Sequence, residues 1–143
     1  MPKITVLVGL PGSGKSYYIK QNSDSKTIIV DDPKNANELP DKLTSDLIIA
    51  DCHLCREKTR ESLHKILQIR YQKAEINYVF FENNPEQCLQ NVKFRNDGRF
   101  VEPTIKNYSK EYNIPDNATV LPVFDTSTLK SNPNNKRRKK LSI

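Results

Sequence analysis

A glycine-rich run between an apolar segment and a helix-forming segment constrains this chain more than any other feature. Residues 9–16 read Gly-Leu-Pro-Gly-Ser-Gly-Lys-Ser and match Gly-x-x-x-x-Gly-Lys-Ser/Thr at every fixed position. Residues 4–8 are mostly β-branched or aliphatic and predict a buried strand, and residues 15 to about 21 predict a helix. A strand, this loop and a helix in sequence predict a P-loop, whose backbone N–H groups surround a phosphate. A glycine-rich turn that binds no nucleotide is the alternative.

The loop supplies most of the predicted nucleotide contacts. We expect the Lys15 ammonium to neutralise the β- and γ-phosphates of ATP and the Ser16 hydroxyl to bind Mg²⁺. ATP and Mg²⁺ are therefore the predicted cofactors. The predicted nucleotide-binding residues are Gly9, Pro11, Gly12, Ser13, Gly14, Lys15, Ser16 and Arg95.

Further apolar runs alternate with helix-like segments along the chain. Strands are predicted at residues 27–30, 47–50, 76–81 and 119–121, and helices at about 56–73, 84–94 and 103–112. In the helix predicted at 84–94, Asn84 is the expected N-cap and Pro85 is the first helical residue. This alternation predicts an α/β fold of the three-layer P-loop NTPase type, nucleoside-kinase-like, in which helices cover both faces of a parallel sheet of about five strands.

Charge divides the 143 residues into a body and a tail. Six of the 23 Lys and Arg residues lie after Asp125, where no acidic residue occurs, so the formal charge of +6 belongs to the tail. We predict a kinase-like domain at residues 1–125 and a disordered basic tail at 126–143. The tail could bind nucleic-acid phosphates or could only increase solubility.

Location and thiol chemistry follow from what the sequence lacks. Apolar runs are only strand-length, so no membrane span is expected, and the start of the chain shows no signal peptide. We expect a cytoplasmic protein, in the host cytoplasm if the gene is viral. Cys52, Cys55 and Cys88 are then expected to be reduced. Zinc is not expected because the Cys-x-x-Cys pair has no second pair, and redox chemistry is not expected because the pair does not follow a thioredoxin-like strand pattern.

Carboxylates follow two of the predicted strands. Asp31 and Asp32 end the second strand, where Asp31 could orient an acceptor hydroxyl and take its proton; the alternative is a turn cap before Pro33. Asp51 ends the third strand, where it could share Mg²⁺ with Ser16 or cap the next helix.

Two arginines flank a polar loop between the last two predicted helices. Arg95 and Arg99 are candidates to contact the transferred phosphoryl group, with Arg95 preferred; both could instead be solvated. The chain lacks the Asn-Lys-x-Asp motif of GTPases and is short for a motor protein.

Together these motifs resemble the 5′-hydroxyl polynucleotide kinases of phage type and related P-loop kinases such as the zeta-toxin-like kinases, over residues 3–123. The glycine loop, the Asp31-Asp32 pair and the Arg95-to-Arg99 segment carry the resemblance. It implies that Asp31 is the general base. It also implies that Lys34, where the family often has arginine, binds the acceptor with Asp31 and Asp32. His53 departs from the family's usual asparagine, and the segment between strands two and three is short.

The resemblance implies an ATP-dependent kinase that acts on the 5′ end of a nucleic acid, with Lys15, Asp31, Arg95 and Arg99 as catalytic residues. A kinase for a nucleoside, nucleotide or other small hydroxyl compound is a second hypothesis. A nucleotide-binding module without catalysis is a third. The sequence does not specify DNA or RNA, ATP or GTP, or an oligomeric state.

Overall fold

The computed structural model describes residues 2–32, 38–96 and 100–126. Five strands form one parallel sheet in the order β2-β3-β1-β4-β5. The strands are β1 (Lys3–Val8), β2 (Ile28–Asp31), β3 (Leu47–Ala50), β4 (Glu75–Phe81) and β5 (Val120–Leu121). The helices are α1 (Lys15–Asn22), the 3₁₀ helix η2 (Cys52–Cys55), α2 (Glu57–Arg70), α3 (Pro85–Arg95) and α4 (Glu102–Glu111).

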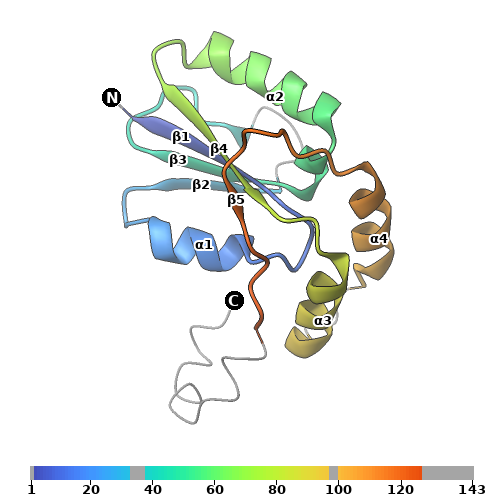
Figure 1. The fold of residues 1–143 in the computed structure, drawn as a ribbon. Helices are drawn as coiled ribbons and strands as arrows, with labels where there is room; N and C mark the ends of the chain where they lie inside the picture. The colour runs from blue at the N-terminus through green and yellow to red at the C-terminus, as the bar shows by residue number, and fades with distance from the viewer. Residues whose placement is uncertain (1, 33–37, 97–99, 127–143) are drawn as a thin grey trace.

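Alternate residues of the central strand β1 enter two separate cores. Ile4, Val6 and Val8 belong to the larger core, which also receives Leu67 from α2 and Ile105 from α4. Leu7 instead packs with Ile19 of α1 in the smaller core on the opposite face. Figure 1 shows α1 on one side of the sheet and α2 on the other. The sheet is thus covered on both faces, which confirms the predicted three-layer α/β architecture.

The predicted elements lie close to the observed ones. The strand predicted at 47–50 is β3, and the Asn84 side chain caps α3 at the Gln87 N–H with Pro85 in the first turn, as expected. The helix predicted at 56–73 is shorter, from Glu57 to Arg70. The 3₁₀ helix η2 was not predicted, because one short turn shows no hydrophobic periodicity.

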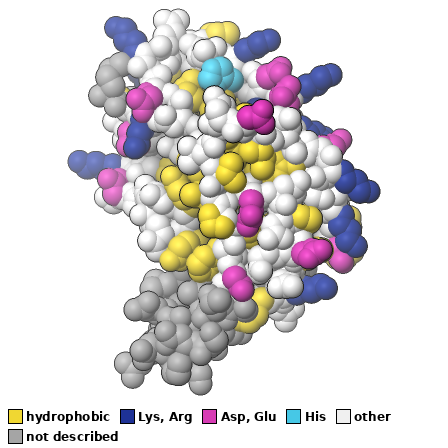
Figure 2. All heavy atoms as spheres, viewed as in Figure 1, with side chains coloured by type: hydrophobic (Ala, Val, Ile, Leu, Met, Phe, Trp, Pro, Cys, Tyr) yellow, Lys and Arg dark blue, Asp and Glu magenta, His cyan; other side chains and the backbone are white. Residues whose placement is uncertain are grey.

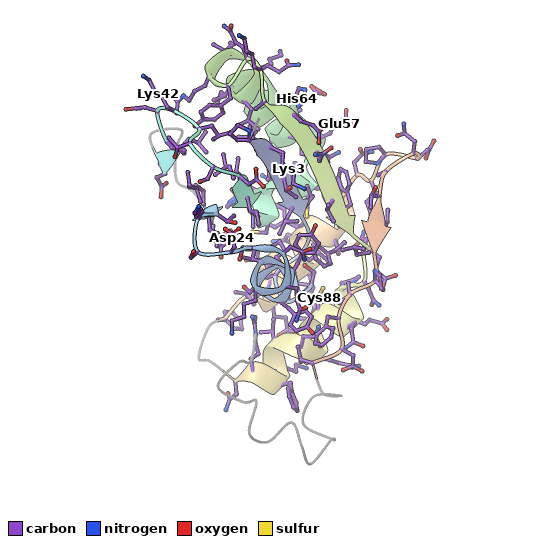
Figure 3. The ribbon with its side chains drawn as sticks, turned by 90° about the vertical axis from the view of Figure 1, so that its left-hand side faces the viewer. Lys3, Asp24, Lys42, Glu57, His64 and Cys88 are labelled. Atoms are coloured by element: carbon purple, nitrogen blue, oxygen red, sulfur yellow. The ribbon has the colours of Figure 1, made fainter. Side chains whose placement is uncertain are left out.

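The carboxyl ends of the parallel strands gather at one edge of the sheet, and α3 lies at this edge. In Figure 3, His64 of α2 lies near the top of the view and Cys88 of α3 lies in its lower half. Since ligands of parallel α/β sheets bind beyond the strand carboxyl ends, this edge is where a site is expected.

The surface bears on possible partners. Figure 2 shows hydrophobic side chains across the middle of one face and charges of both signs around its margin. On this face, the described residues form no patch of one sign of charge, in keeping with the neutral body. No helix in the described part of the chain is both long and apolar enough to cross a membrane.

Candidate active site

The glycine loop connects β1 to α1 and is packed tightly against α3. Gly12 has φ of +84° and Gly14 of +110°, a left-handed backbone that side-chain-bearing residues rarely adopt. A Cβ atom at Gly12 would lie 2.6 Å from the carbonyl oxygen of Cys88 in α3. Both glycines are therefore required by the loop's conformation, and the one at position 12 also by its contact with α3.

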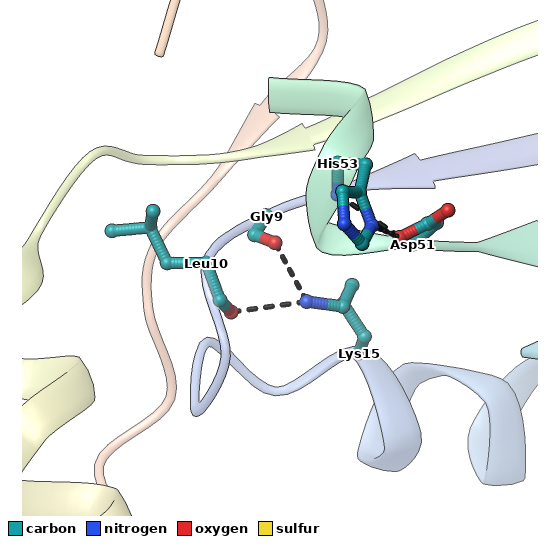
Figure 4. Close-up of polar contacts among 5 residues, drawn as sticks. All are labelled: Gly9, Leu10, Lys15, Asp51 and His53. Atoms are coloured by element: carbon teal, nitrogen blue, oxygen red, sulfur yellow. Dashed lines mark hydrogen bonds and ion pairs between the residues drawn. The ribbon is translucent and has the colours of Figure 1, made fainter. Parts of the chain in front are cut away.

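Lys15 folds back into this loop. Its Nζ donates hydrogen bonds to the carbonyl oxygens of Gly9, at 2.6 Å, and Leu10, at 3.0 Å (Figure 4). Burial lowers the pKa of the Lys15 ammonium, and the negative charge of Cys52 when ionised and, more weakly, that of Asp32 oppose this shift. Its described hydrogen-bond partners are neutral carbonyls, which leave the positive charge available to an anion.

A cleft that is open to solvent lies beside the loop. It brings together predicted residues from the loop, the end of β2 and the end of α3, as the parallel sheet requires. The predicted site residues on its wall are Pro11, Gly12, Gly14, Lys15, Ser16, Asp31, Asp32 and Arg95.

Gly9 and Ser13, also predicted to contact nucleotide, do not line the cleft. Ser13 is completely buried, its N–H donates to the Leu10 carbonyl at 3.1 Å and its carbonyl accepts from the Phe124 N–H at 3.3 Å. The Ser13 hydroxyl has no hydrogen-bond partner among the described residues. Both residues therefore stabilise the loop without lining the cleft, Ser13 through its backbone hydrogen bonds and Gly9 through the carbonyl that accepts from Lys15.

The two aspartates at the end of β2 are exposed at the cleft. Asp31 lies opposite Ala50 of β3 in the register, and the Asp32 N–H donates to the Ala50 carbonyl at 2.7 Å. Asp32 has φ of 50°, unusual for a residue with a side chain. Such strain is concentrated at functional positions, where the surrounding structure maintains it. The proposed turn cap before Pro33 lies outside the described residues.

Asp51 caps η2. Its Oδ1 accepts from the backbone N–H of His53 at 3.0 Å and lies 2.7 Å from Nδ1 of the same histidine (Figure 4). The residue is 8% exposed and is absent from the cleft wall. The capping alternative is therefore observed, and the Mg²⁺ role stays a prediction. The ligand atoms of Asp51, Cys52 and His53 also lie within 4.8 Å of one another, close enough to share a metal ion.

The polar loop flanked by the two candidate arginines is described in part. Arg95 ends α3 and lines the cleft, and the next residue, Asn96, closes the helix with φ of 48°. Arg99 and Lys34, predicted to contact phosphate and acceptor, lie outside the described residues.

Three cleft residues were not predicted: Cys52, Asn91 and Thr126. Asn91 lies one turn before Arg95 and thus on the same face of α3, a spacing that could have identified it. Thr126 was assigned to the tail, yet it is 6% exposed and its N–H donates to Asn91. The packed body includes this residue, and positions 127–143 lie outside the described residues.

The residues present fit a nucleoside triphosphate with a divalent cation. The loop offers a glycine cradle, the Lys15 ammonium has only carbonyl partners among the described residues, and the exposed Ser16 lies at the start of α1 on the cleft wall. A helix N-terminus adds favourable potential for phosphate. Lys15 and Ser16 are therefore placed to hold the two ligands.

Comparison with solved structures supports this description of the fold. The chain matches the crystal structure of a gluconokinase from Sinorhizobium meliloti 1021 with a TM-score of 0.59, covering 85% of this chain and 82% of that one. The two sequences are 11% identical, so the similarity concerns the fold alone.

Sequence comparison gives the family. No family model matches the chain. A protein of Acanthamoeba polyphaga mimivirus, described as uncharacterized protein R277, is 36% identical over 121 residues, which cover 78% of this chain and 87% of that protein. At this identity and coverage, the chain belongs to the same family as the mimivirus protein.

Proposed function

We propose that this protein is an ATP-dependent kinase that transfers the γ-phosphoryl group to a hydroxyl. The observation that carries the proposal is that Lys15, Asp31 and Arg95 line one cleft at the carboxyl edge of the sheet. A cation on the phosphate loop, a carboxylate across the cleft and an arginine at a helix end make up the chemistry that phosphoryl transfer requires.

ATP would supply the phosphoryl group, and Mg²⁺ would neutralise part of its charge. Lys15 would exchange a carbonyl hydrogen bond for one to a phosphate oxygen, which relieves the unfavourable burial of its charge. The Ser16 hydroxyl would hold the cation. Arg95, whose guanidinium carries a permanent charge, would stabilise negative charge on the transferred group.

Asp31 would act on the acceptor. Its position at the end of β2 separates it from the phosphate loop by the whole of β3, since the sheet order is β2-β3-β1. An acceptor between Asp31 and the loop could present its hydroxyl to both. The carboxylate would orient that hydroxyl and accept its proton as the new O–P bond forms and the bond from the γ-phosphorus to the departing ADP breaks. Asp31 is therefore the proposed general base.

The proposed acceptor is the 5′-hydroxyl of a polynucleotide. The motif resemblance carried by the glycine loop, the Asp31-Asp32 pair and Arg95 supports it. A small hydroxyl compound is the second candidate, because the fold neighbour is named a gluconokinase.

Transfer of labelled γ-phosphate from ATP tests the proposal. The acceptors are 5′-hydroxyl DNA and RNA oligonucleotides, a nucleoside mixture and gluconate, each with wild type and Lys15→Ala. Lys20→Ala is the matched control, because Lys20 is an exposed lysine on α1 away from the cleft wall. Oligonucleotide labelling that Lys15→Ala abolishes is the expected result. Labelling of nucleosides or gluconate alone would favour the second candidate, and no transfer to any acceptor would contradict the proposed activity.

A further inference from the structure

A buried asparagine joins three segments that form the cleft wall. Asn91 of α3 is 2% exposed, and its Nδ2 donates to the Gly12 carbonyl at 2.8 Å and to the Phe124 carbonyl. Its Oδ1 accepts from the Thr126 N–H at 3.1 Å and from the Thr126 hydroxyl at 3.2 Å. Phosphate loop, helix and C-terminal segment thus meet at one side-chain amide.

The chemistry of these contacts requires an amide. Two backbone carbonyls at one end need a donor, and an N–H with a hydroxyl at the other end needs an acceptor. Aspartate has the shape of asparagine but would place an oxygen against the carbonyls of Gly12 and Phe124. A buried amide with both ends bonded fixes the relative position of its partners, because each lost hydrogen bond leaves a buried polar group unsatisfied.

Asn91 and Arg95 are separated by one helical turn and both line the cleft. The Gly12 carbonyl that Asn91 holds belongs to the same loop as Lys15. The hydrogen bond from Asn91 to the Gly12 carbonyl therefore links the loop that carries Lys15 to the helix that carries Arg95.

We propose that Asn91 is a positioning residue that locks the phosphate loop, α3 and the segment 124–126 into one frame, so that Arg95 reaches the phosphate bound by Lys15. This inference rests on the proposed kinase function. Asn91 does not itself act on the transferred group. Its effect on turnover passes through Arg95, which distinguishes it from a residue that merely stabilises the fold.

A double-mutant cycle tests this coupling. Asn91→Asp is expected to lower kcat about 10- to 100-fold, since a misplacement near 1 Å has effects of this size, with less than about threefold change in the KM for ATP. In an Arg95→Ala background, the same substitution should lower kcat by less than about threefold, because the group that it displaces is already gone. Independent losses that multiply in the double variant would overturn the proposal.

Two control variants separate positioning from stability. Gln87→Ala removes another hydrogen bond to Asn91, of 3.0 Å, from a residue off the cleft wall, and should leave kcat within about twofold. Ile105→Val weakens the core in α4 at a residue that does not line the cleft, and should lower the Tm without lowering kcat at 25 °C. If Asn91→Asp does not fold, Asn91→Ala takes its place in the cycle.

Hydrogen exchange supplies a readout that needs no activity. The Ser13 N–H donates to the Leu10 carbonyl, and the Phe124 N–H donates to the Ser13 carbonyl. Exchange at these two amides therefore reports the contact between the loop and the C-terminal segment. Asn91→Ala should speed exchange at both amides while β1 exchanges as in wild type. Unchanged exchange at these amides would overturn the proposal that Asn91 holds the loop, α3 and residues 124–126 in fixed relative positions. If wild type shows no kinase activity but Asn91→Ala still speeds exchange at these two amides, the proposed function is contradicted while the positioning role of Asn91 remains supported.

Discussion

At the scale of single residues, three thiols lie around Lys15 at different depths. Cys55 and Cys88 have no exposed surface, and burial raises the pKa of each to about 12. Cys52 is partly exposed on the cleft wall, and burial raises its pKa to a lesser extent. Because the thiolate is the reactive form, this difference in accessibility makes Cys52 a chemical reporter of the cleft.

We predict that iodoacetamide modifies Cys52 alone in the folded protein and all three cysteines in urea. The native rate should increase with pH through and above 9, as the thiolate of Cys52 forms. ATP with Mg²⁺ should slow the reaction, because Cys52 and Lys15 line the same cleft. Mass spectrometry of tryptic peptides measures the modification, and Cys52→Ser serves as the unreactive control. Equal modification of Cys88 in the folded chain would contradict the described burial.

The substitution Asp31→Asn distinguishes an enzyme that uses Asp31 as general base from a nucleotide-binding module without catalysis. An amide can still orient a hydroxyl but cannot take its proton, so turnover should fall by about 10²- to 10⁴-fold. The affinity for ATP, measured by calorimetry, should stay within about threefold. Asp116→Asn is the control, since Asp116 is an exposed carboxylate that does not line the cleft. Turnover unaffected by Asp31→Asn would remove this residue from the mechanism.

At the scale of elements, η2 depends on a buried arginine of α2. Nη1 of Arg60 donates to the carbonyls of Leu54 and Cys55, at 2.8 and 3.0 Å, and Nη2 donates to Asn113 Oδ1 at 3.0 Å. The residue is only 6% exposed. Arg60 therefore satisfies the carbonyl end of η2, whose other end is capped by Asp51.

Arg60→Met should lower the free energy of unfolding by about 3 kcal/mol, because it leaves the buried Leu54 carbonyl without its donor and removes a donor from the Cys55 carbonyl, which keeps the Asn113 N–H. Lys58→Met, an exposed substitution on the same helix, should change it by less than about 0.5 kcal/mol. Urea denaturation followed by circular dichroism measures both. A loss as small as that of the control would mean that water replaces the arginine at these carbonyls.

The elements also show why the sequence predicts some parts of the site and misses others. Hydrophobic periodicity and a local motif suffice for β1, the glycine loop and α1, since each is determined by neighbouring residues. The Asn91 contact to Gly12 spans 79 positions, and its contact to Thr126 spans 35. Such contacts depend on how α3 packs against the loop, which no local pattern encodes. Arg60 was missed for a related reason, because arginine on a helix is usually solvated.

At the scale of the whole molecule, charge and burial together set how stability depends on pH. Cys55 and Cys88 have no exposed surface and are the most deeply buried thiols. Their ordinary pKa of 9.0 applies in the unfolded chain, whereas in the folded chain it is about 12. Between these values the unfolded chain loses protons that the folded chain keeps, so stability decreases as pH rises.

We therefore predict that stability falls above pH 9 by about 1.4 kcal/mol per pH unit for each of the two thiols. Lys15 acts in the opposite direction, because its lowered pKa makes the folded chain bind fewer protons than the unfolded chain. Comparing variants cancels this shared contribution: Cys88→Ala should flatten the slope by about 1.4 kcal/mol per unit, although it lowers stability at neutral pH. Ile105→Val should lower the whole curve without changing its slope. Urea titrations from pH 7 to 11 measure these slopes, and a Cys88→Ala curve parallel to wild type would show that the Cys88 thiol ionises as readily in the folded chain as in the unfolded one.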